Sequence, residues 1–109
     1  MDIELEKKFK LLLSNLEKKF GQGLDVQSVL FLIGVQELGK GAQKFNKQEK
    51  TELMHIAICV LLEKYGFYSY EGKDSDGWPH YTLIKELPPL EHKEQQLLIK
   101  KAILTYFEF

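Results

Sequence analysis

The sequence contains no arginine: its 15 basic residues are all lysines. Without arginine the chain lacks the planar guanidinium group that binds guanine or phosphate through two parallel hydrogen bonds. A formal net charge of −1 also gives the molecule no overall field that would attract a polyanion. These two features argue against a nucleic acid as the partner.

Cysteine is almost absent as well, and long hydrophobic runs are missing. Cys59 is the only cysteine, so no internal disulfide can form and we expect a reducing, cytoplasmic setting. The longest apolar runs, residues 29–35 (counting Gly34) and 56–62, are far shorter than the roughly 20 residues that cross a bilayer. The charged start of the chain does not resemble a secretion signal. We therefore expect no membrane association.

The 109 residues fit one domain with one hydrophobic core. No repeat, linker or low-complexity segment divides the chain. The glycine patterns of cofactor-binding loops are also missing, so we expect no cofactor. The sequence predicts a mainly α, α+β domain over residues 1–109: three helices, an aromatic β-hairpin and a C-terminal helix.

Apolar spacing and turn residues predict the first two helices. The first covers residues 2–20, with Asp2 as its N-cap and Gly21 as its stop. The second covers residues 26–38 after Asp25 and has little polar surface, so we expect it to be buried. Gly34 inside it costs about 1 kcal/mol relative to alanine, which predicts a close neighbour at that position.

The third helix has the clearest boundaries. Asn46 and Glu49 have the spacing of a capping box, and Gly66 follows a predicted helix over residues 47–65. From Leu53 to Leu62 every residue except His55 is apolar, which predicts a central, largely buried helix.

The hairpin is predicted over residues 67–85, with strands at 67–71 and 78–85 around a loop of glycine, aspartate and serine. The last helix is predicted to begin near Leu90 and to reach almost to the C-terminus.

The hairpin carries the strongest candidate for a binding surface. Aromatic residues are concentrated there, and side chains alternate between the two faces of a strand. One set can therefore stay accessible for a partner, and we select Tyr68, Tyr70, Trp78 and Tyr81 as the interaction surface. The alternative is that these side chains pack against the last helix.

Two further groups of residues could carry chemistry. His55 and Cys59 lie one helical turn apart and could bind a metal or form a thiolate–imidazole pair, although a buried histidine beside an inert cysteine is simpler. A lysine-rich connection before the third helix could bind an anion, with a solvated loop as the alternative; its residues are Lys40, Lys44, Lys47 and Lys50. Asp74 and Asp76 match a calcium loop only in part, so we expect an ordinary hairpin turn.

Two resemblances bear on function. The order of helices, hairpin and final helix resembles a winged-helix domain, in which the third helix would enter the major groove. Residues 32–39 (LIGVQELG) and 76–81 (DGWPHY) are similar to an uncharacterised family of small bacterial proteins, which implies a bacterial cytoplasmic protein and supplies no site.

The leading interpretation is a non-enzymatic protein–protein interaction module, which binds another protein or itself through the hairpin and the last helix. The first alternative is a winged-helix-like nucleic-acid binder. The second is a small metal-binding or thiol-dependent enzyme that uses His55 and Cys59.

Overall fold

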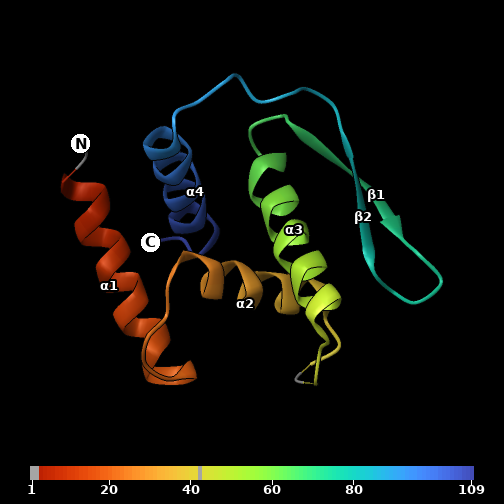
Figure 1. The fold of residues 1–109 in the computed structure, drawn as a ribbon, viewed down its shortest axis with the longest axis horizontal. Helices are drawn as coiled ribbons and strands as arrows, with labels where there is room; N and C mark the ends of the chain where they lie inside the picture. Colours follow the sequence, from red (N-terminus) through yellow and green to blue (C-terminus); the bar gives the residue numbers. More distant parts are fainter. Residues whose placement is uncertain (1–2, 42) are drawn as a thin grey trace. The chain divides into compact units, whose positions relative to one another are not determined.

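The computed structural model describes residues 3–41 and 43–109 (Figure 1). It contains, in order, α1 (Ile3–Phe20), α2 (Val26–Leu38), α3 (Lys47–Glu63), β1 (Tyr68–Lys73), β2 (Pro79–Leu83) and α4 (His92–Tyr106). This order confirms the predicted α+β class. The chain forms two compact units, one made of the described residues up to Val26 together with Pro89–Phe109, the other of Gln27–Pro88. The expectation of a single domain stays a prediction.

The first unit pairs α1 with α4. Apolar side chains at helical spacing are buried on each helix: Phe9, Leu12 and Leu16 on α1, and Ala102, Ile103 and Leu104 on α4. Lys100 of α4 bonds both carboxylate oxygens of Glu6 at 3.2 Å. As predicted, Gly21 ends α1, with a positive φ of 100° and an N–H that donates to the carbonyl of Glu17. Asp2, the predicted N-cap, lies outside the described residues.

The second unit is built around α3, whose predicted start is confirmed. The Asn46 side chain accepts from the Glu49 N–H at 2.8 Å, and the Glu49 carboxylate accepts from the Asn46 N–H at 2.9 Å. The helix ends at Glu63, two residues before the predicted end at residue 65, and Gly66 follows with a φ of 82°. Local hydrogen bonds thus set both ends of this helix.

The hairpin forms a two-stranded antiparallel sheet that packs on α3 (Figure 1). Tyr68 pairs with Leu83 and Tyr70 with Tyr81, and a bulge at Glu71 shifts the register before Gly72 pairs with His80. The bulge lets β1 continue to Lys73, beyond the predicted end at residue 71. Strand β2 covers residues 79–83 and is shorter than the predicted strand over residues 78–85.

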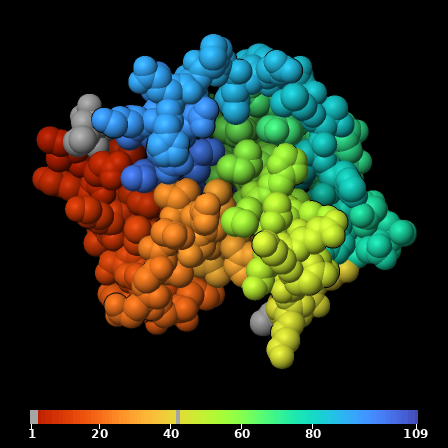
Figure 2. All heavy atoms as spheres, in the orientation of Figure 1, coloured from red at the N-terminus to blue at the C-terminus, as the bar shows by residue number. Residues whose placement is uncertain are grey.

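The core next to the hairpin is formed by Leu38, Phe45, Leu53 and Ile56, with Trp78 and Tyr81 packed against it. Figure 2 shows the atoms of the hairpin, in teal, beside those of α3, in green to yellow.

The last helix begins at His92, two residues after the predicted start. Glu91, the residue before the helix, is extended with a ψ of 158° and is therefore outside the helix. The Glu94 carboxylate then accepts from the Glu91 N–H at 3.2 Å. None of the helices in the described part of the chain has the length and apolar content needed to span a bilayer.

A candidate binding cleft between α3 and the hairpin

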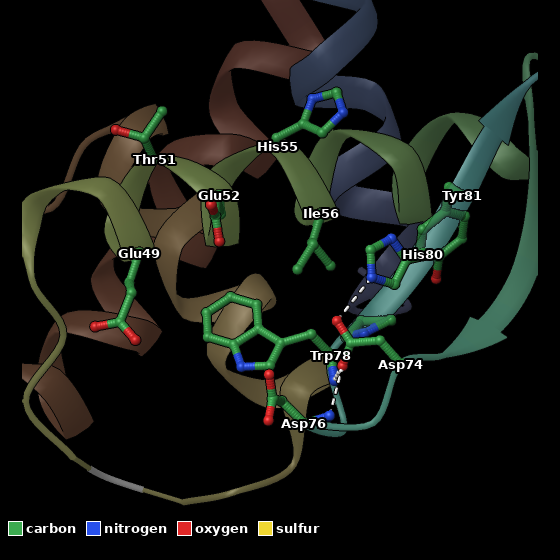
Figure 3. A pocket seen from close by; sticks show the side chains of 11 residues that line it. Glu49, Thr51, Glu52, His55, Ile56, Asp74, Asp76, Trp78, His80 and Tyr81 are labelled. Carbon is green, nitrogen blue, oxygen red and sulfur yellow. Dashed lines mark hydrogen bonds and ion pairs between the residues drawn. The ribbon is translucent and has the colours of Figure 1, made fainter.

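A cleft of about 630 Å³ opens between the N-terminal half of α3 and the hairpin (Figure 3). Residues from α3 form one side: Glu49, Thr51, Glu52, His55 and Ile56. Residues from the hairpin form the other: Asp74, Asp76, Trp78, Pro79, His80 and Tyr81. Both sides belong to the unit of residues 27–88, so the site lies within one compact part of the chain.

The floor of the cleft is apolar and aromatic. Ile56 and Pro79 are buried, and Trp78 and Tyr81 are half-buried. The Trp78 ring meets Phe45 edge-on with ring centroids 6.5 Å apart, and Phe45 meets Phe31 in the same way at 6.0 Å. These aromatic contacts fix the indole while part of it stays open to the cleft.

Asp74 organises the hairpin turn at the rim. Its Oδ1 accepts from the backbone N–H groups of Asp76 and Trp78, both at 2.9 Å. Its Oδ2 lies 2.8 Å from His80 Nε2. The His80 bond, followed by the backbone bonds, lowers the pKa of the Asp74 carboxyl. Because both oxygens accept hydrogen bonds from the turn and from His80, Asp74 stabilises the hairpin turn.

Of the other three carboxylates at the rim, one accepts a hydrogen bond and two accept none from the part of the chain that the structure describes. Glu49 is bound to the start of its own helix through the capping box. Glu52 and Asp76 are exposed, and within the described residues no hydrogen bond or ion pair holds either carboxylate. In the view of Figure 3 the Trp78 indole lies between them. These two groups are the charges that remain open to a ligand.

The structure separates the four residues of the predicted interaction surface. Trp78 and Tyr81 line the cleft. Tyr68 lies outside the cleft lining and packs edge-on against His55, with ring centroids 6.3 Å apart. Tyr70 is 46% exposed and stacks at a tilt on Tyr81 at 5.4 Å. Within its own unit, the helix beneath this aromatic face is α3, and packing against the last helix stays a prediction.

Burial also changes the chemistry of Tyr81. Desolvation, followed by the charges of Glu63 and Glu37, raises the pKa of its phenol to about 12. Its hydroxyl stays protonated well above neutral pH and can donate a hydrogen bond at the cleft floor.

His55 and Cys59 do lie together, with Cys59 Sγ 3.6 Å from His55 Nε2. The expectation of a buried histidine is wrong, since His55 is exposed and lines the cleft. Cys59 is 2% exposed, and burial raises the pKa of its thiol to about 11. Within residues 3–41 and 43–109 no three His, Cys, Asp or Glu side chains are placed to hold a metal ion.

The four lysines of the predicted anion site have different surroundings. Lys40 donates to the backbone carbonyl of Asp76, and its Cε would lie 3.2 Å from a β-carbon at Gly77. Lys40 therefore ties the connection after α2 to the hairpin turn. Lys44, Lys47 and Lys50 are exposed.

Sequence reasoning missed much of the cleft, including Thr51, Glu52, Ile56 and Pro79. Its two sides are distant in the chain, and no motif links them. The one available signal was the pairing of aromatic residues with acidic ones around the turn at residues 74–78. Comparisons of the chain with protein-family models, with curated proteins and with solved structures find no significant match.

Proposed function

We propose that this protein is a non-enzymatic interaction module that binds a segment of another protein in the cleft between α3 and the hairpin. The observation that carries the proposal is the open cleft whose floor includes Trp78 and Tyr81. Tryptophan and tyrosine dominate the energetics of protein interfaces, because they offer a large contact area with few rotamers to immobilise.

The geometry of the floor supports this role. Packing against Phe45 immobilises Trp78 before any partner arrives, so little conformational entropy remains to be lost on binding. Ile56 and Pro79 also line the cleft and add apolar surface. The proposal thus keeps Trp78 and Tyr81 from the predicted interaction surface and assigns Tyr68 to packing against α3.

The chemistry of the nearby groups disfavours the thiol-enzyme alternative. The thiolate is the reactive form of cysteine, and a pKa of about 11 leaves Cys59 almost fully protonated at neutral pH. The Thr51 hydroxyl at the rim donates to the carbonyl of Lys47 at 3.2 Å and has no base beside it in the described contacts.

Charge disfavours the winged-helix alternative. A helix that enters the major groove and a wing that follows the backbone both need surfaces that attract phosphates. Here Lys47 and Lys50 at the start of α3 are balanced by Glu49 and Glu52, and Asp74 and Asp76 outnumber Lys73 at the hairpin turn. We further propose a cytoplasmic location, on the basis of the single unpaired cysteine.

The test is capture of a partner by the whole protein from its native host, after nuclease treatment, with paired variants. Thr51→Trp fills the cleft from an exposed position on its rim. Gln48→Trp adds the same side chain at an exposed position of α3 that does not line the cleft. We expect a near-stoichiometric protein that is lost with Thr51→Trp and retained with Gln48→Trp.

Three outcomes would contradict the proposal. One is capture of nucleic acid alone, which would favour the winged-helix alternative. Another is a protein partner that Thr51→Trp does not displace, which would place the interface elsewhere. The third is the absence of any stoichiometric partner, including a second copy of the chain by analytical ultracentrifugation.

A further inference from the structure

We infer that the occupant of the cleft is a basic segment of the partner protein, with a lysine or arginine side chain lying against Trp78 between the carboxylates of Glu52 and Asp76. This inference rests on the proposed function and names the chemistry of the partner.

The cleft is lined by negatively charged side chains. Four carboxylates belong to its lining, at Glu49, Glu52, Asp74 and Asp76, and among the described residues none of those that line it is a lysine. Lys40, whose ammonium donates to the Asp76 backbone carbonyl, offsets one of these four charges, so the cleft keeps a local excess of negative charge. Such a cleft attracts cations and repels phosphates and acidic peptides.

Two of the four carboxylates are available to bind a ligand. Asp74 is saturated by two backbone N–H groups and His80, and Glu49 caps α3. The carboxylates of Glu52 and Asp76 have no such partners within the described residues. They come from different elements, and both line the cleft.

An aromatic surface lies between the carboxylates of Glu52 and Asp76 in the view of Figure 3. The indole of Trp78 is half-buried and held by Phe45, and it lies between the two carboxylates in Figure 3. Tryptophan is the aromatic side chain that binds cations best through its ring face. The aliphatic part of a lysine or arginine would then pack on Ile56 and Pro79, which are buried at the cleft floor.

An inorganic cation explains these features less well. No set of three metal-binding side chains occurs in the described part of the chain, and an aromatic, apolar floor contributes nothing to a hard cation that prefers oxygen ligands. A side chain that is both cationic and partly apolar uses the carboxylates and the floor together.

The test uses the fluorescence of Trp78, which is the only tryptophan in the chain. The probe is a capped octapeptide of alternating glycine and arginine, and the matched control is a peptide of alternating glycine and glutamate. We expect a saturable change in Trp78 emission with the arginine peptide, weaker at high salt, and no change with the glutamate peptide.

Isosteric variants test the two carboxylates. The double variant Glu52→Gln, Asp76→Asn should weaken binding of the arginine peptide by about tenfold, since each exposed ion pair contributes up to about 1 kcal/mol. The control double variant Glu71→Gln, Glu86→Gln changes the net charge equally at exposed positions outside the cleft. It should change the dissociation constant by less than about twofold.

Several results would overturn the inference: no saturable change with the arginine peptide, an equal response to the glutamate peptide, or equal losses in the two double variants. Failure here is distinguishable from failure of the proposed function. If Thr51→Trp still displaces the captured protein while Glu52→Gln, Asp76→Asn does not, the cleft remains the interface and its occupant is not a basic segment.

Discussion

The backbone carbonyl of Leu53 in α3 occupies the place where a β-carbon at Gly34 in α2 would lie. Such a carbon would be 2.7 Å from the Leu53 carbonyl carbon and 2.9 Å from its Cβ. Both neighbours are held by their own helix, so neither can move aside as the end of a flexible side chain could. The glycine in the middle of α2, predicted to mark a close neighbour, therefore allows α2 and α3 to approach at this point.

Gly34→Ala should lower the free energy of unfolding by about 1–2 kcal/mol. Overpacking of this kind costs about 1–3 kcal/mol or more, and the gain of about 1 kcal/mol in helix propensity offsets only part of it. Urea denaturation followed by circular dichroism measures the change. Gln36→Ala, at an exposed position of the same helix, should change stability by less than about 0.5 kcal/mol. A Gly34→Ala variant as stable as the parent would show that the helices separate without cost.

Asn46→Ala should destabilise the second unit by about 1 kcal/mol, because it removes the side-chain acceptor for the Glu49 N–H at the start of α3. The same urea titration measures this loss. Asn46→Asp keeps an acceptor oxygen next to the positive end of the helix dipole and should retain most of the stability. Equal losses in both variants would mean that the cap bond is not the source of the effect.

The Asp74 turn should make the hairpin sensitive to acid. Its pKa is lowered in the folded protein, chiefly by the bond to His80, so the stabilisation is complete above the unfolded pKa of about 3.9. It is then lost as the pH falls through the lower, folded pKa. Amide hydrogen exchange of β1 and β2 between pH 2.5 and 6 should show this loss of protection after correction for intrinsic rates.

Asp74→Asn is the matched variant for this measurement. It cannot titrate, so its hairpin should be less protected at pH 6 and should lose less additional protection on acidification. The idea fails if parent and variant show the same pH dependence.

The buried thiol of Cys59 should react slowly. With a pKa of about 11, its thiolate fraction at pH 8 is about 0.1%, against about a quarter for an ordinary cysteine of pKa 8.5. We expect alkylation by iodoacetamide to be at least about 100-fold slower in the native protein than in urea, with a rate that rises up to about pH 11. Fast alkylation at neutral pH would revive the thiol-enzyme alternative.

The sequence did not predict correctly which face of an element meets a neighbour. His55 was expected to be buried because the residues around it in α3 are apolar. The structure turns this position outward to the cleft, while Ile56, Ala57 and Cys59 are buried. A helix with little polar surface has no clear outer side in its sequence, so its neighbours decide its orientation. The bulge at Glu71 likewise extended β1 beyond the turn signals that predicted its end.

The sequence by itself determined the order of the elements and the helix boundaries at Gly21 and Asn46, because each depends on hydrogen bonds or backbone angles within a few residues. Only the tertiary structure decided the cleft. In the sequence, the rest of α3 and all of β1 separate Glu52 from Asp76. They share a site because the hairpin packs on α3. Apolar side chains pack with little directional preference, so their pattern predicts that two elements bury a face but not which polar groups meet at its edge.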